Sequence, residues 1–495
     1  MKYLLGYDIG SSSVKAALLE ADTGKVVAHA FSPEHEMQIH SPQAGFAEQH
    51  PELWWNELIH ATKKIQQQLP YKPDDIIAIG ISYQMHGLVC IDKDHQPLRP
   101  AIIWCDSRAV DIGDNAFHEL GETFCLQHFL NSPGNFTASK LKWVKENEPH
   151  LFEKIYKVFL PGDYIAMKLT GETTTTVSGL SEGILWDYQA NSVAKELLAY
   201  YEIDKNLLAA IVPTFGEQGK LIAGAAKMLG LTSGIPVSYR AGDQPNNAYS
   251  LNVLQPGEIA ATAGTSGVVY GVTDKANNDP LSRVNSFVHV NHKPGSPRYG
   301  VLLYVNGTGS LNSWLRKNLL TGLSYQEINK EAASVPIGSD GLRFYPFGNG
   351  AERILMNKDS GADLQGLQFN RHQRGHIARA AQEGIVFALN YGMEIMQEMG
   401  MELQTVRAGH ANMFLSEVFA TTFANTSGCT VELYNTDGAA GAARAAGVGV
   451  NFYQNFSESF TGMEIIKRIE PQIQQQQQTS EAYQKWRLHL TITSS

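Results

Sequence analysis

The sequence has 495 residues, enough for two or three domains at about 150 residues each. Hydrophobic residues make up 43% and charged residues 18% of the chain, a globular composition that excludes disordered, collagen-like and disulfide-scaffold proteins. The 39 Lys and Arg residues are outnumbered by 49 Asp and Glu residues, and the net charge of −10 argues against a nucleic acid or an anionic membrane surface as partner.

The sequence predicts no membrane helix and no export signal. The apolar run at residues 1–7 meets Asp8, which makes it too short for the core of a signal peptide. No uncharged apolar run approaches the roughly 20 residues that span a bilayer. Cys90, Cys105, Cys125 and Cys429 show neither CxxC nor metal-site spacing, so we expect reduced, mostly buried thiols in a cytoplasmic protein.

The first half of the chain predicts strands that alternate with helices. Apolar runs at residues 3–7 and 14–19 flank a tight polar turn and predict a hairpin. Residues 51–69 carry apolar side chains at helical spacing behind a proline suited to the first turn, which predicts a helix. Apolar runs at 76–82 and 235–239 predict two further strands.

The second half repeats part of this pattern. Residues 258–262 and 268–272 again predict two strands around a turn rich in Gly, Ser and Thr, and residues 376–399 predict a long helix. The glutamine run at 474–478 precedes a predicted helix at 481–490 and is interpreted as helix surface. Strands alternating with helices, and a hairpin that recurs half a chain apart, predict an α/β protein with domains at residues 1–253 and 254–495.

Several familiar catalytic motifs are missing. The sequence contains no Gly-x4-Gly-Lys-Ser/Thr loop and no protein-kinase signature set. His35 and His40 are five residues apart, which does not suit a zinc protease helix. Gly179 to Gly183 matches the Gly-x-Ser-x-Gly pattern, so an acyl hydrolase using Ser181 stays open as an alternative.

The two hairpin turns are candidate phosphate sites. Their backbone amides and small hydroxyl side chains can form a concave anion site, and a carboxylate beside the first turn, Asp8, suits a Mg²⁺ ion that bridges to phosphate. Asp243 follows the predicted strand at 235–239, where α/β folds place catalytic groups. For either turn alone an ordinary hairpin is the simpler interpretation, and Asp243 alone could be a helix N-cap.

Taken in order along the chain, these segments resemble the FGGY family of carbohydrate kinases from residue 1 to about residue 447. The segments that carry the resemblance in the first half are Asp8 to Ser13, Glu48 to Trp55, Gln84-Met85-His86-Gly87, Leu98 to Arg108, Ser139 to Val144 and Leu160 to Tyr164. In the second half they are Gly264 to Gly267, Tyr345 to Phe347, Glu352-Arg353, Gly366-Leu367 and His376 to Glu383. The chain departs from the family pattern at Asn135, at Gln244-Pro245 after Asp243, and at Ala408-Gly409-His410-Ala411, where the family usually has Gly-Gly.

The resemblance implies two ribonuclease-H-like, actin-like ATPase domains with an active-site cleft between them, the sugar held by the first and the nucleotide by the second. It implies phosphorylation of D-xylulose at O5 with ATP and Mg²⁺; another polyol such as gluconate or ribulose, and a non-catalytic sugar sensor, are the alternatives. The resemblance implies that Asp243 is the catalytic base and that Asp8 and Asp243 form the Mg²⁺ site. The implied sugar contacts are Met85, His86, Trp104 and Asp243. The implied phosphate contacts are Gly10, Ser11, Ser12, Gly264, Thr265 and Ser266, and the implied nucleoside contacts are Gly309, Gly409 and His410. The sequence leaves the oligomeric state open, with a homodimer among the alternatives.

Overall fold

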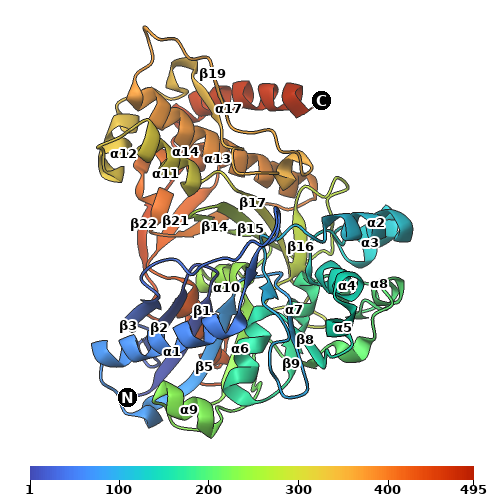
Figure 1. The fold of residues 1–495 in the computed structure, drawn as a ribbon. Helices are drawn as coiled ribbons and strands as arrows, with labels where there is room; N and C mark the ends of the chain where they lie inside the picture. Colours follow the sequence, from blue (N-terminus) through green and yellow to red (C-terminus); the bar gives the residue numbers. More distant parts are fainter. Residues whose placement is uncertain (495) are drawn as a thin grey trace. The chain divides into compact units, whose positions relative to one another are not determined.

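The computed structural model describes residues 1–494, with side chains through Leu490. It divides into two compact units, each built around its own β-sheet (Figure 1). The first unit comprises residues 1–252, 287–298 and 436–463, and the second comprises residues 253–286, 299–435 and the chain from 464 onward. Each unit therefore contains segments that are distant in the sequence.

The sheet of the first unit has five strands in the order β13-β5-β1-β2-β3. Their bounds are β1 (Tyr3–Ile9), β2 (Val14–Glu20), β3 (Val26–Ser32), β5 (Ile76–Tyr83) and β13 (Val237–Gly242). β1, β5 and β13 run parallel, whereas β2 and β3 are antiparallel to their neighbours. The carboxyl ends of the three parallel strands therefore lie at one edge of the sheet.

Helices cover both faces of this sheet. α1 (Pro51–Gln68) packs on one face, where Tyr7 Oη and Thr62 Oγ1 are 2.6 Å apart. The alanine-rich helix α15 (Gly438–Gly449) packs on the other face. It comes so close to Gly6 that a Cβ atom there would lie 2.0 Å from the Ala439 carbonyl oxygen, so the strand needs glycine at this position.

Shorter elements complete the first unit. They are β4 (Glu48–Gln49), β6 (Val89–Ile91), β7 (Ala101–Ile102), α2 (Val110–Leu120), α3 (Glu122–His128), α4 (Thr137–Asn147), α5 (Pro149–Phe152), β8 (Lys157–Phe159), α6 (Pro161–Thr170), β9 (Thr174–Thr176), α7 (Val177–Glu182), β10 (Trp186–Asp187), β11 (Ser192–Val193), α8 (Lys195–Tyr200), β12 (Ala210–Val212), α9 (Ala223–Leu229), α10 (Asp243–Ser250) and α16 (Phe456–Ser459).

The second unit is built on a seven-stranded sheet in the order β16-β17-β15-β14-β20-β21-β22. The strand bounds are β14 (Glu258–Ala263), β15 (Gly267–Thr273), β16 (Asn285–Val288), β17 (Tyr299–Val305), β20 (Thr405–Gly409), β21 (Thr430–Tyr434) and β22 (Ile465–Ile469). A separate strand pair is formed by β18 (Arg343–Tyr345) and β19 (Asp363–Gln365). Helices are stacked beside the large sheet (Figure 1): α11 (Gly309–Asn318), α12 (Tyr325–Ala333), α13 (Arg374–Glu398), α14 (Glu417–Ser427) and α17 (Ile473–Ser494).

The structure confirms the predicted fold class, two α/β units. The two predicted hairpins are β1–β2 and β14–β15, and the helices predicted at 51–69 and 376–399 are α1 and α13, with ends shifted by one or two residues. The helix predicted at 481–490 is part of α17, which begins earlier, at Ile473. The glutamine run lies within α17, as predicted. The domain boundary after residue 253 stays a prediction; the structure adds that residues 287–298 and 436–463 group with the first unit.

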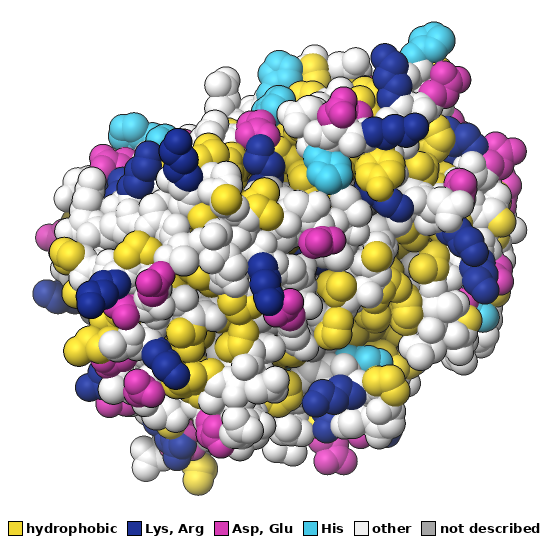
Figure 2. All heavy atoms as spheres, turned by 90° about the horizontal axis from the view of Figure 1, so that it is seen from below, with side chains coloured by type: hydrophobic (Ala, Val, Ile, Leu, Met, Phe, Trp, Pro, Cys, Tyr) yellow, Lys and Arg dark blue, Asp and Glu magenta, His cyan; other side chains and the backbone are white. Residues whose placement is uncertain are grey.

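The surface and the cysteines agree with an ordinary globular protein. Figure 2 shows acidic and basic side chains interspersed over one face. Cys90, Cys125 and Cys429 are buried free thiols and Cys105 is an exposed one, which confirms the prediction for the cysteines. Within residues 1–494, no helix combines the length and the apolar character needed to cross a bilayer.

Candidate active site

Two aspartates lie at the carboxyl edge of the first unit's sheet. Asp8 is the last residue but one of β1, and Asp243 directly follows β13 as the first residue of α10. β5 lies between these strands, with Ser82 in register with Asp8. The structure therefore brings together two residues that are 235 positions apart in the sequence and that the sequence assigned to one site.

The Asp8 carboxylate is held by neighbours on three sides. Ser82 Oγ donates a hydrogen bond to Oδ1 over 2.8 Å, and Lys15 Nζ lies 3.7 Å from Oδ2. A Cβ atom at Gly438, the first residue of α15, would lie 2.8 Å from Oδ2, so glycine lets the helix N-terminus approach the carboxylate. The pKa of Lys15 is raised, mainly by the charge of Asp8 and further by Asp437 and Asp243. One lysine thus faces a group of three carboxylates.

Asp243 has the electrostatic character of a base that works near neutral pH. Burial, followed by the negative charge of Asp8, raises its pKa from 3.8 to about 7. Hydrogen bonds from Gln244 and the charge of Lys15 act in the opposite direction. A carboxylate with a pKa near the working pH accepts a proton much better than an ordinary exposed aspartate does.

Charged residues that the sequence analysis did not single out lie behind Asp243. The Glu182 carboxyl at the end of α7 lies so close to Gly242 that a Cβ atom there would be 2.5 Å from Glu182 Oε2, and burial raises its pKa well above the ordinary range. Arg240 of β13 forms a fully buried ion pair with Asp163 of α6, Nε to Oδ1 at 3.0 Å. The sequence contained a signal for both residues of this ion pair. Asp163 lies in one of the segments that resemble the family, and Arg240 comes three residues before Asp243.

The segment Met85-His86 is locked in place beneath the same edge. His86 adopts a left-handed conformation with φ of 60°, and its Nδ1 donates a hydrogen bond to the Glu182 carbonyl oxygen over 2.9 Å. The buried Lys140 donates through Nζ to the carbonyl oxygen of His86 over 2.9 Å, and burial lowers the pKa of this lysine to about 8. Met85 is buried beside Gly242. These contacts fix both predicted sugar contacts near Asp243.

The first turn, residues 10–13, is held by hydrogen bonds within the first unit. Gly10 N donates to Ser13 O over 3.1 Å, and Gln49 Nε2 donates to Ser11 O over 2.7 Å. Trp104 is 45% exposed and places its indole Nε1 3.3 Å from Ser11 Oγ. The predicted phosphate turn and Trp104, a predicted sugar contact, are therefore neighbours.

The second unit brings its predicted residues together in the same way. Gly309 N donates to Gly264 O over 2.9 Å, and Ser310 N donates to Thr265 O over 3.1 Å. A Cβ atom at Gly309 would lie 2.2 Å from the Gly264 oxygen, so this contact requires glycine. The start of α11 thus rests directly on the turn formed by Gly264, Thr265 and Ser266.

Gly409 and His410 lie at the end of β20, which pairs in parallel with β14, the strand that leads into Gly264. His410 is exposed, and its backbone N–H donates to Tyr434 O over 2.8 Å. The six residues of this unit that are predicted to contact the nucleotide therefore lie at the ends of β14 and β20 and at the start of α11.

Glu352 is a further residue of this edge, and the sequence analysis gave it no role. Its fully buried side chain accepts hydrogen bonds from Asn306 N at 3.0 and 3.3 Å. Burial raises the pKa of this carboxyl to about 8, against the effect of the backbone donors at Asn306 and Gly307. Glu352 therefore braces the loop that leads to Gly309.

The carboxylates of the first unit fit Mg²⁺ better than a metal that needs a full protein cage. Among the described residues, no group of three or more His, Cys, Asp or Glu side chains is arranged to hold a metal. Mg²⁺ keeps most of its water and binds through one or two carboxylates together with substrate phosphates. Asp8, with Asp243 at the same edge, matches that donor set.

The Gly-x-Ser-x-Gly match is not a nucleophile elbow. Ser181 lies at the fifth position of α7 and not at the strand-to-helix turn, and its side chain is 1% exposed. Its Oγ donates to Ser178 O over 2.8 Å and accepts from Val288 N over 3.0 Å. The hydroxyl is buried with both partners supplied, and the geometry gives an acyl hydrolase no support.

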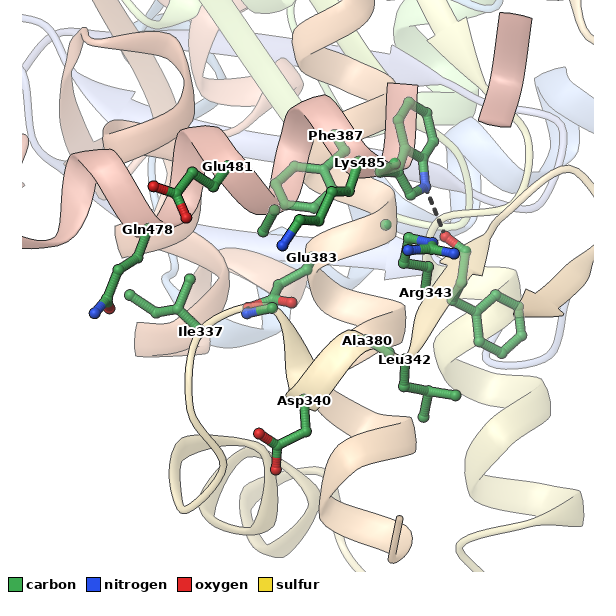
Figure 3. A pocket seen from close by; sticks show the side chains of 16 residues that line it. Ile337, Asp340, Leu342, Arg343, Ala380, Glu383, Phe387, Gln478, Glu481 and Lys485 are labelled. Atoms are coloured by element: carbon green, nitrogen blue, oxygen red, sulfur yellow. Dashed lines mark hydrogen bonds between the residues drawn. The ribbon is translucent and has the colours of Figure 1, made fainter. Parts of the chain in front are cut away.

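A cavity of about 270 Å³ lies elsewhere in the second unit, between α13, α17 and residues 337–344 (Figure 3). Glu383 and Lys485 line it from the two helices. Glu383 is already paired with Arg379, Nε to Oε1 at 2.7 Å. None of the residues that the sequence assigned to the active site lines this cavity.

Comparison with known proteins agrees with this arrangement. Residues 3–249 match the model of the FGGY family of carbohydrate kinases, N-terminal domain, and residues 259–450 match the C-terminal domain of the same family. The chain is 30% identical over 455 residues to a xylulose kinase of Escherichia coli, with 90% of each chain covered, and 29% identical over 467 residues to one of Bacillus subtilis, with 92% of this chain and 90% of the relative covered. The crystal structure of a xyloylose kinase from Brucella ovis superposes with a TM-score of 0.88 at 26% identity, covering 99% of both chains.

Proposed function

The chain belongs to the FGGY family of carbohydrate kinases, and we propose that it transfers the γ-phosphoryl group of ATP to O5 of D-xylulose. The sugar is assigned from two xylulose kinases, each of which the chain matches over nine-tenths of its length. The observation that carries the chemistry is the aspartate at the end of β13, with its pKa raised to about 7, beside the carboxylate of Asp8.

In this proposal Asp243 is the catalytic base. The O5 oxygen of the sugar forms a bond to the γ-phosphorus, the bond from that phosphorus to the β–γ bridging oxygen breaks, ADP leaves, and the O5 proton passes to Asp243. In a loose transition state the proton moves late, so orienting the hydroxyl group is the larger part of this residue's task. The raised pKa supports the role, because the carboxylate then holds the proton once it has received it.

Asp8 and Asp243 would hold Mg²⁺, with Asp8 binding through water. When bound, Mg²⁺ supplies positive charge that neutralises the phosphates. Lys15 Nζ lies 3.7 Å from Asp8 Oδ2 and its positive charge also acts on Asp243, so it reduces the repulsion between the two carboxylates. The contact from Ser82 to Oδ1 fixes the direction in which Asp8 presents its other oxygen.

The two turns would bind phosphates through backbone amides, because a turn whose amides point outward forms a concave anion site. The residues proposed for the phosphates are Gly10, Ser11, Ser12, Gly264, Thr265 and Ser266, and those proposed for the nucleoside are Gly309, Gly409 and His410. The hydrogen bonds from Gly309 and Ser310 to the turn at Gly264 and Thr265 support a shared role, since they hold α11 and the turn as one rigid element.

Met85, His86 and Trp104 are proposed as sugar contacts. The strained backbone of His86 supports this role, because a non-glycine residue at φ of 60° costs energy and such strain is concentrated at functional sites. The two anchoring contacts to its ring and its carbonyl oxygen keep that geometry fixed. The exposed ring of Trp104 offers an apolar wall for the carbon chain.

An ADP-release assay with Mg-ATP tests the proposal across D-xylulose, L-ribulose, D-gluconate, glycerol and a control without sugar. We expect kcat/KM to be highest for D-xylulose. A higher value for another polyol would replace the sugar and leave the kinase chemistry standing, whereas sugar binding without turnover would identify a sensor.

We further propose a cytoplasmic location, because the reaction consumes ATP. Fractionation of cells followed by the same assay tests this. Light scattering of the purified protein decides between a monomer and the homodimer that the sequence left open.

A further inference from the structure

Gln84 is a buried amide whose polar atoms lack partners. It directly follows β5, its side chain is 3% exposed, and its backbone N–H donates to Ile9 O over 2.8 Å. Neither Oε1 nor Nε2 has a hydrogen-bond partner within the described part of the chain. Burying an amide without compensation is costly, so such a group is retained where something other than folding requires it.

The strand register places Gln84 at the sheet edge that holds both aspartates. The hydrogen bond from Gln84 N to Ile9 O continues the β1–β5 ladder by one residue beyond β5, and side chains alternate between the faces of a strand, so Ser82 and Gln84 lie on the same face. The hydrogen bond from Ser82 to Asp8 identifies that face as the one on which Asp8 lies. On the other neighbouring strand, Gly242 is in register with Tyr83, so Asp243 follows beside Gln84.

The chemistry of an amide selects among the possible partners. Nε2 is a donor and Oε1 is an acceptor, so a complete partner must both accept and donate. A phosphate oxygen only accepts, and a water molecule held by a metal ion mainly donates. A sugar hydroxyl group and a free water molecule both do so, and the hydroxyl group is the one that must lie next to Asp243 for the transfer to occur.

We propose that Gln84 is a sugar-binding residue that holds a hydroxyl group of the acceptor beside Asp243. This inference rests on the proposed kinase function and adds a contact to Met85 and His86, the next residues in the chain. The amide lies at the end of a buried central strand, so it is held in place before the sugar arrives.

The test replaces the amide by an apolar side chain of similar size, Gln84→Met. Because the amide has no partner in the protein, the substitution should leave resistance to urea unchanged or increased. We expect the KM of the sugar to rise by about tenfold or more while the KM of ATP changes by less than twofold. A sugar KM within twofold of the wild type would overturn the inference, and so would a loss of stability with equal changes in both KM values.

Gln218 provides the matched control. It is also a buried glutamine of the first unit, but its Nε2 donates to Pro213 O over 2.8 Å and to Thr214 O over 3.2 Å. Gln218→Met should therefore reduce resistance to urea and leave the sugar KM unchanged. The opposite pattern in the two variants would show that Gln84 is the structural amide, which contradicts the inference.

Deoxy sugars identify the hydroxyl group. One deoxy analogue should lack the hydroxyl group that Gln84 contacts, and the wild-type protein should bind it about as weakly as Gln84→Met binds the parent sugar. Gln84→Met should bind that same analogue with little further loss of affinity. If every analogue is weakened equally in both proteins, Gln84 contacts no sugar hydroxyl group. Calorimetric titration of the full chain with sugar alone gives these affinities without turnover, so failure of the kinase proposal and failure of this contact are separate results.

Discussion

Asp243→Asn should make the protein more stable while it removes most of the activity. The pKa of Asp243 is raised from 3.8 to about 7 in the folded protein. Between about pH 4 and about pH 7 the folded state therefore keeps a proton that the unfolded chain has already released. Stability attributable to this group therefore falls as the pH rises from about 4 to about 7 and is constant above. Asparagine is neutral at every pH and avoids this loss.

The magnitude follows from the size of the pKa difference. Three pKa units at about 1.4 kcal/mol each give a cost of about 4 kcal/mol at pH 8, and of about 2 kcal/mol at pH 5, where only the unfolded chain is ionised. These figures are upper bounds, because water that enters the site lowers the cost of the charge. The gain in stability of Asp243→Asn over the wild type should accordingly be larger at pH 8 than at pH 5 by about 2 kcal/mol.

Native-state hydrogen exchange read by mass spectrometry suits this measurement, because it follows the opening of β5 and β13 separately from the second unit. The exposed Asp22→Asn serves as the control and should show no such pH-dependent gain. In the kinase assay, Asp243→Asn should reduce kcat by about a thousandfold with little change in the sugar KM. An equal gain at both pH values, or near-normal turnover, would refute the electrostatic account of this residue.

Three further predictions concern the neighbours of these groups. Lys15→Met removes the positive charge that lowers the pKa of Asp243, so the fall of kcat/KM on the acid side of its pH profile should move to higher pH; an unmoved profile would mean that Asp243 is not the titrating base. His86→Ala should raise the sugar KM about tenfold and leave the ATP KM unchanged, and equal effects on both would contradict a sugar contact. Glu352→Ala leaves Asn306 N without its acceptor, so the ATP KM should rise about tenfold while Glu352→Gln, which keeps an acceptor oxygen, stays close to the wild type.

The two hairpins, the long helices and the α/β class could be predicted because their signals are local. Apolar periodicity, a proline at a helix start and small residues in a turn act over a few residues, and the chain alone contains them. The positions of Asp8 and Asp243 at strand ends were predictable for the same reason. The assignment of both to one site needed the order of motifs along the chain.

Other features depended on neighbours that are far away in the sequence. Ser181 matched a catalytic pattern, yet its hydroxyl group is buried and bonded to Val288, more than 100 residues away. Glu352 looked like part of a motif and turned out to brace the loop before Gly309. A short sequence motif carries no information about the distant residues, Val288 and Asn306, that bond to these side chains.

The sequence by itself determined the fold class, the family and the list of candidate residues, because these follow from short patterns in a consistent order. Only the tertiary structure decided that residues 436–463 group with the first unit and place Gly438 against Asp8, that Asp243 has a pKa near 7, and that the Gln84 amide is buried without a partner. Burial and electrostatic potential are sums over every group packed around a side chain, and most of those groups come from distant parts of the chain.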